Sequence, residues 1–140
     1  MIRFKQLPEN ITELIPQAVN YLESTPDVVF AYLFGSLAKG KLRPLSDVDI
    51  AVYLAAPLSF SDVKLDILGK LIDILHTDEI DLVVLNTADL PLAMNILKNK
   101  VVVVDKDPFV RHIYESLTMR KYFDFSIKEA AILRRRYLHG

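Results

Sequence analysis

Two aspartates separated by one residue are the clearest candidates for chemistry in this sequence. Asp47 and Asp49 open the segment DVDIAVYL, which we predict to be a β-strand over residues 47–54. Side chains alternate between the two faces of a strand, so both carboxylates project from one face while Val48 and Ile50 point into the core. Two carboxylates this close repel each other unless a cation joins them. Mg²⁺ prefers oxygen ligands and takes one or two carboxylates together with substrate phosphates, so the pair predicts a metal site that handles phosphates.

A third carboxylate, Asp81, lies near the start of another predicted strand, Ile80–Leu85. If that strand pairs beside residues 47–54, Asp81 reaches the same metals. Three converging carboxylates suit a two-metal phosphoryl-transfer site, and Asp81 is the candidate to accept the proton of the attacking hydroxyl. The alternative is that Asp78, Glu79 and Asp81 together form a solvated strand entry.

Gly35 and Ser36 follow the apolar segment VVFAYLF at once. Glycine lets a phosphate approach the backbone, the amides at a helix start face an anion, and the Ser36 hydroxyl adds a hydrogen-bond donor. Lys39, Lys41 and Arg43 lie between this turn and the aspartates, and Arg43 can hold a phosphate bidentately. Gly35, Ser36, Lys39 and Arg43 are therefore candidate nucleotide-binding residues. The alternatives are a simple turn and a solvated basic loop.

These residues need a sheet to position them, and the hydrophobic periodicity predicts one. The connection between residues 28–34 and residues 47–54 has 12 residues, which is short for a helical crossover and favours an antiparallel pair. The result is an α/β (α+β) fold with a single mixed sheet flanked by helices. The predicted strands are Val28–Phe34, Asp47–Leu54, Ile80–Leu85 and Val101–Val104; the predicted helices are Ile11–Ser24, a turn at Leu37–Lys39, Phe60–Leu75, Pro91–Leu97, Pro108–Tyr122 and Ser126–Leu138, the last two broken near Phe123–Phe125.

The overall composition limits the classes of protein to be considered. With 140 residues we expect one domain over 1–140, with a core at about 10–105 and C-terminal helices at about 108–139. A net charge of −1 argues against a partner that is a long nucleic acid. The absence of cysteine excludes a thiolate metal site and a disulfide scaffold. No apolar stretch predicts a signal peptide or a membrane span, so we expect a cytoplasmic protein without a membrane partner.

The motif resembles the signature of the DNA polymerase β-like nucleotidyltransferase superfamily. That signature is Gly-Ser, a spacer of about ten residues, and Asp-x-Asp; here Gly35-Ser36 is followed by the ten residues LAKGKLRPLS and then Asp47-Val48-Asp49. The family's third carboxylate matches Asp81 in EIDLVVL. The resemblance implies the family's fold with a C-terminal helical tail, metal binding by Asp47, Asp49 and Asp81, Mg²⁺ (two ions) as cofactor and a nucleoside triphosphate as substrate.

Among relatives, the short chain is similar to the minimal nucleotidyltransferase (MNT) antitoxins encoded beside a HEPN-domain ribonuclease toxin. The helical tail with Tyr122-Phe123-Asp124 adds to this likeness. The resemblance implies an enzyme that transfers AMP from ATP to a tyrosine of the HEPN toxin and silences it, in a hetero-oligomer with that toxin. Two alternatives stay open: a non-catalytic antitoxin that acts by binding, and a nucleotidyltransferase that modifies a small molecule such as an antibiotic.

Overall fold

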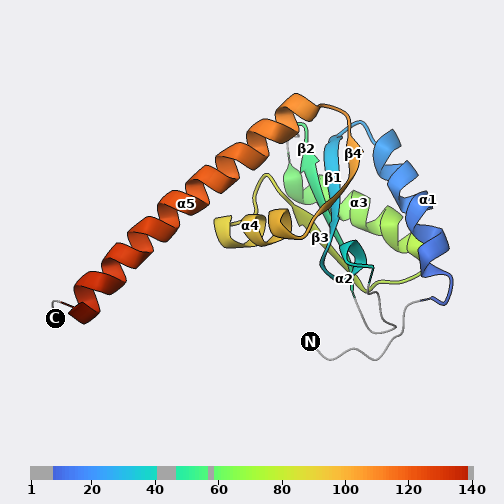
Figure 1. The fold of residues 1–140 in the computed structure, drawn as a ribbon. Coiled ribbons are helices and arrows are strands. Elements are labelled where there is room, and N and C mark those ends of the chain that lie inside the picture. Colours follow the sequence, from blue (N-terminus) through green and yellow to red (C-terminus); the bar gives the residue numbers. More distant parts are fainter. Residues whose placement is uncertain (1–7, 41–46, 57–58, 139–140) are drawn as a thin grey trace.

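The computed structural model describes residues 8–40, 47–56 and 59–138, which form one sheet with helices on both faces (Figure 1). The order of elements follows the sequence-based prediction closely. The helices are α1 (Ile11–Ser24), α2 (Gly35–Ala38), α3 (Phe60–Leu75), α4 (Leu90–Lys98) and α5 (Pro108–Leu138); the strands are β1 (Val28–Phe34), β2 (Val48–Leu54), β3 (Ile80–Val84) and β4 (Val101–Asp105).

The strands are arranged in the order β3-β2-β1-β4, which makes the sheet mixed. β1 pairs antiparallel with β2 and with β4, whereas β2 and β3 run parallel. The predicted antiparallel pairing of the two motif-bearing strands is confirmed, and the condition on which the role of Asp81 depended, that β3 pairs beside β2, is met. β1 and β2 occupy the centre because their side chains are apolar on both faces and are almost entirely buried.

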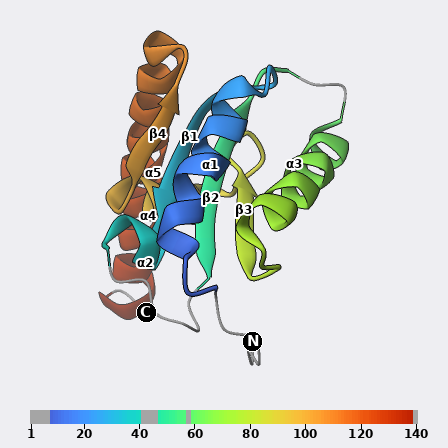
Figure 2. The ribbon, with the colours of Figure 1, turned by 90° about the vertical axis from the view of Figure 1, so that its right-hand side faces the viewer.

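Two apolar clusters hold the helices to opposite faces of the sheet. On one face, α1 and α3 pack through the buried side chains of Leu22, Leu71 and Leu75. On the other face, Phe30 and Ile96 belong to a cluster that α4 and the first turns of α5 cover. Figure 1 shows α4 and α5 on one side of the strands and α1 and α3 on the other, and Figure 2 looks onto the face that α1 covers. Because strand side chains alternate between the two faces, each central strand contributes residues to both clusters. At the end of the sheet that the helices do not cover, one face carries polar groups.

α5 is one continuous helix, so the prediction of two helices broken near Phe123–Phe125 is wrong. That segment contains no proline or glycine, and aromatic residues and aspartate lower helix propensity by only a few tenths of a kcal/mol each. The Tyr122 and Phe125 rings also contact each other along the helix, with centroids 6.3 Å apart. The helix therefore runs on past the sheet and projects away from the rest of the fold (Figure 1).

Candidate active site

Gly35 directly follows β1 and begins α2, in a conformation that an L-residue rarely adopts. Its φ is +65°, in the left-handed region that favours glycine. A Cβ atom at this position would overlap the Asp49 carboxylate, with the Asp49 Cγ only 3.1 Å away. The Lys39 amide donates to the Gly35 carbonyl at 3.3 Å, which closes the single turn of α2. Gly35 and Asp49 are thus in direct contact across two strands, which explains why the first must be a glycine.

Asp49 lies on the central strand β2 between residues of the two neighbouring strands. It is the register partner of Phe34 on β1 and of Asp81 on β3. Register partners on adjacent strands project from the same face, and neighbouring strands are about 4.8 Å apart. The end of β1 at Gly35, Asp49 and Asp81 therefore form a row across three strands at one end of the sheet.

Asp47 lies just before β2, which begins at Val48, so the predicted start of this strand was one residue too early. The expected alternation is present: Val48 and Ile50 are buried, whereas Asp47 and Asp49 are half-buried. Burial of Val48 and Ile50 in the α1–α3 cluster fixes the strand, and hence the side toward which both aspartates project.

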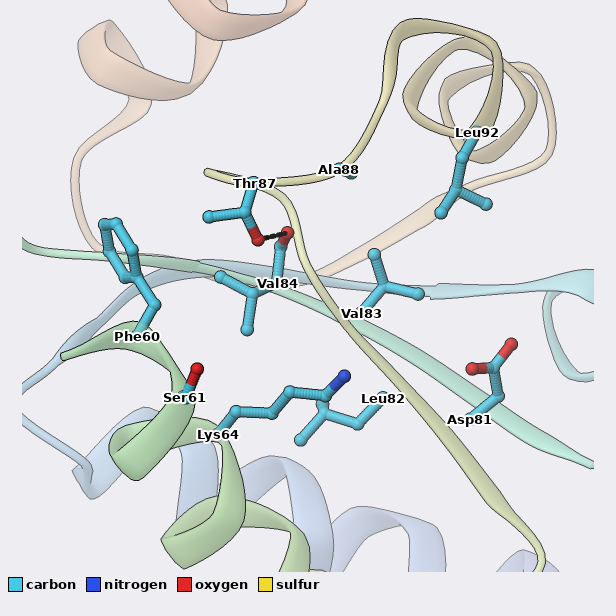
Figure 3. Close-up of a pocket in the computed structure, with 10 residues that line it drawn as sticks. All are labelled: Phe60, Ser61, Lys64, Asp81, Leu82, Val83, Val84, Thr87, Ala88 and Leu92. Atoms are coloured by element: carbon cyan, nitrogen blue, oxygen red, sulfur yellow. Dashed lines mark hydrogen bonds between the residues drawn. The ribbon is translucent and has the colours of Figure 1, made fainter.

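Asp81 is exposed and lies on β3, the strand at one border of the sheet. It also lines a hollow of about 520 Å³ between α3 and α4, together with Lys64 of α3 and Leu92 of α4. In Figure 3, Lys64 reaches from α3 toward β3 and Asp81 stands at the other end of the hollow. The same carboxylate therefore belongs both to the row at Asp49 and to an open cavity.

The predicted phosphate-binding residues are only partly described by the structure. Ser36 is half-buried in α2, and Lys39 is exposed one residue after that helix. Lys41 and Arg43 lie outside the described residues. Ser36 and Lys39 are thus on the β1 side of Asp49, opposite to Asp81.

The donor chemistry of this row suits a hard cation in part. Asp49 and Asp81 are side by side in register, and an Mg²⁺ site needs only one or two carboxylates when substrate phosphates complete it. Among residues 8–40, 47–56 and 59–138, no group of three or more His, Cys, Asp or Glu side chains is placed to hold a metal ion. The arrangement therefore fits a metal shared with a bound triphosphate rather than a cage formed by the protein alone.

A buried polar network that the sequence did not reveal anchors α5 to the same face of the sheet. The Tyr32 hydroxyl donates to Glu115 at 2.6 Å, and Glu115 also pairs with Arg111 at 3.1 Å and Lys100 at 3.4 Å. Burial and the Glu115 hydrogen bond raise the pKa of Tyr32 well above its usual value. Although burial opposes it, the Tyr32 hydrogen bond and the charges of Lys100 and Arg111 hold the pKa of Glu115 below its usual value. The Arg111–Glu115 spacing of four was the one signal available in the sequence.

Comparison with known proteins places the chain in a family. The model of the family "polymerase beta, nucleotidyltransferase" matches residues 17–109. Among curated proteins, none matches this chain closely enough to count as a relative. The match covers more than half of the chain, and the chain therefore belongs to the polymerase β nucleotidyltransferase family.

Several solved structures of the same fold are chains from toxin–antitoxin complexes. One chain of a toxin–antitoxin structure with AMP-PNP is 25% identical, with a TM-score of 0.69 over 86% of this chain and 94% of that chain. A chain from a point mutant of the MntA–HepT toxin–antitoxin pair is 27% identical, with a TM-score of 0.65 over 91% and 96%. A chain from the complex of a tri-AMPylated HEPN toxin of Shewanella oneidensis with its MNT antitoxin has a TM-score of 0.63 over 89% and 92%, and at 23% identity shows the fold alone.

The described residues contain no helix that is both long enough and apolar enough to cross a bilayer.

Proposed function

We propose that this protein is an MNT antitoxin that uses ATP to adenylylate a tyrosine hydroxyl of a partner HEPN ribonuclease toxin in the cytoplasm. The observation that carries the proposal is the row of Gly35, Asp49 and Asp81 across β1, β2 and β3. Membership of the nucleotidyltransferase family and likeness to chains of toxin–antitoxin complexes support it.

The row of residues gives each of the two substrates its own side of Asp49. The triphosphate of ATP lies at Gly35 and Ser36, at the start of α2, with Lys39 beside it; Arg43, the other basic candidate from the sequence, lies outside the described residues. The acceptor hydroxyl comes from the opposite side, at Asp81. The hydroxyl oxygen bonds to the α-phosphorus, the bond from that phosphorus to the bridging oxygen breaks, and pyrophosphate leaves. Asp81 receives the hydroxyl proton.

Asp49 and Asp81, side by side in register, are the residues that would hold Mg²⁺, as one or two ions completed by substrate phosphates, and Asp47, two residues before Asp49, is the further candidate ligand. When bound, the metal supplies positive charge for the triphosphate and for the developing charge of the transition state. The protein contributes position: Val48 and Ile50 fix the strand from the core side, and Gly35 leaves room for the Asp49 carboxylate.

The test uses ATP labelled at either the α- or the γ-phosphorus, with Mg²⁺ and the product of the neighbouring gene, which the proposal identifies as the HEPN protein. We expect the α-label and not the γ-label to appear on the HEPN protein. Transfer of the γ-label would identify a kinase instead. An Asp66→Asn variant, changed on the exposed side of α3, is the matched control for Asp49→Asn.

A second candidate function, neutralisation by binding alone, is favoured by the surface of α5. Large apolar side chains stay exposed along this helix, well past its contacts with the sheet; they include Phe123, Ile127, Ile132 and Tyr137. Such a surface is typical of a chain that functions in a complex. If Asp49→Asn leaves the HEPN protein bound and inhibited, binding alone accounts for the neutralisation.

A further inference from the structure

β3 borders the sheet, and its outer edge faces the hollow that Asp81 lines. No strand in the described part of the chain pairs along this edge. The hollow is walled by Phe60, Ser61 and Lys64 of α3 on one side and by Ala88 and Leu92 on the other (Figure 3). We name this feature, with residues 81–84 as its floor, the β3 edge groove.

The backbone of β3 presents hydrogen-bonding groups to this groove. The Val48 amide donates to the Glu79 carbonyl at 3.0 Å, and the Leu85 amide donates to the Val52 carbonyl at 2.8 Å. In a parallel ladder, the backbone groups of alternate residues bond to the same neighbouring strand. The amides and carbonyls of the odd-numbered residues of β3 therefore point toward β2, and those of the even-numbered residues point outward. The amide and carbonyl of Leu82 therefore point into the groove.

Val84 follows the same alternation. Its carbonyl is already used, because the Thr87 amide donates to it at 3.2 Å. Its amide points outward with that of Leu82. The groove thus offers two donors and one acceptor along one line, which is the pattern that an added strand requires.

The groove has room for an occupant and leads to the candidate active site. A volume of about 520 Å³ is within the range of ligand-binding clefts, and an added strand would lie about 4.8 Å from β3. Natural proteins usually cover or blunt such an edge. Here the helices flank the edge without covering it, and Asp81 is at the end nearest Asp49.

We propose that the β3 edge groove binds an extended segment of the acceptor protein by strand addition and brings the segment's tyrosine hydroxyl to Asp81. The inference rests on the proposed function, because it takes the HEPN protein as the acceptor of AMP. Phe60, Leu92 and Val83 supply apolar contacts for the segment's side chains, and Lys64 favours a segment that carries a carboxylate. The triphosphate site and the acceptor site are then on opposite sides of Asp49.

Kinetics of groove variants test the proposal. Lys64→Glu and Leu92→Arg should each raise the KM for the HEPN protein by roughly tenfold or more and leave the KM for ATP unchanged, since a repulsive contact of about 1.4 kcal/mol suffices for tenfold. Lys70→Glu and Leu65→Arg are the matched controls, because both side chains are exposed on α3 and do not line the groove. An unchanged KM for the HEPN protein in both groove variants would overturn the proposal.

Hydrogen exchange provides a readout that needs no turnover. Adding the HEPN protein to the Asp49→Asn variant should slow exchange of the Leu82 and Val84 amides. Fast exchange of both amides in a complex that protects only α5 would refute strand addition. Slow exchange of the same amides in this chain alone would also refute it, because the edge would then be paired between two copies of the chain. If the wild-type protein transfers no AMP yet these amides become protected, the proposed function fails while the groove is still a partner-binding site.

Discussion

Gly35→Ala should impair catalysis far more than it impairs folding. The residue has a φ of +65°, where an L-residue is strained by about 1–2 kcal/mol. The added methyl group would also overlap the Asp49 carboxylate, which must retreat by more than about 1 Å to reach ordinary van der Waals contact. A displacement of about 1 Å of a group that positions the reactants costs on the order of 100-fold in rate.

Variants of two other glycines separate the effect of backbone strain from the effect of the overlap with Asp49. Gly40 has a φ of +67° with open space around a Cβ atom, so Gly40→Ala carries the backbone strain without the overlap. Gly69 in α3 has open space and no such φ, so Gly69→Ala carries neither and should stabilise the helix by about 0.5–1 kcal/mol.

The assay is the rate of AMP transfer to the HEPN protein at saturating ATP, with thermal unfolding measured in parallel. We expect Gly35→Ala to lose about 100-fold in kcat. Gly40→Ala should lower the unfolding midpoint and keep kcat within a few-fold of the wild type, and Gly69→Ala should keep full activity. A wild-type kcat for Gly35→Ala, in a protein that still binds ATP, would refute the assignment of Asp49 to the reacting centre.

Further predictions concern the metal, the Tyr32 network and α5. Chelation of divalent ions should abolish AMP transfer, and added Mg²⁺ should restore it, as followed by label incorporation. Tyr32→Phe should lower the free energy of unfolding by about 1.5–3 kcal/mol and the thermal midpoint by roughly 5–10 °C, because it removes the 2.6 Å hydrogen bond to buried Glu115. Calorimetry measures this effect, with Tyr53→Phe as the control. Folding lowers the pKa of Glu115, so its contribution to stability is present above the unfolded value of 4.5 and is lost as the pH falls below that value. Folding raises the pKa of Tyr32, so stability should fall above pH 10, where the tyrosine of the unfolded chain ionises. Denaturant titrations at a series of pH values check both predictions. Phe123→Asp should weaken association with the HEPN protein in sedimentation experiments without changing the unfolding midpoint, since its side chain is 65% exposed.

Strand patterning allowed much of the site to be predicted from the sequence. Alternation placed Asp47 and Asp49 on one face, and the short connection after β1 implied an antiparallel pair; the structure has both features. The approach of Asp81 to Asp49 was conditional on β3 pairing beside β2, and the register meets that condition. The alternation and the antiparallel pair depend on residues close in sequence and on a period of two, which a sequence displays directly.

Features that depend on tertiary packing were not foreseen. Gly35 was expected to make room for a phosphate, whereas the structure shows that its missing side chain makes room for the Asp49 carboxylate. The Tyr32–Glu115 bond joins residues 83 positions apart, and nothing local to either one predicts it. The expected break near Phe123–Phe125 was wrong because aromatic residues alone do not end a helix, and no proline or glycine interrupts α5.

The most direct test of the central claim is the intact mass of the HEPN protein after incubation with this chain, ATP and Mg²⁺, followed by mapping of the modified residue. The account predicts a mass increase of one or more AMP units on tyrosine with the wild-type chain, and none with Asp49→Asn or Asp81→Asn. An unmodified HEPN protein that is nonetheless inhibited by the wild-type chain would contradict the enzymatic account.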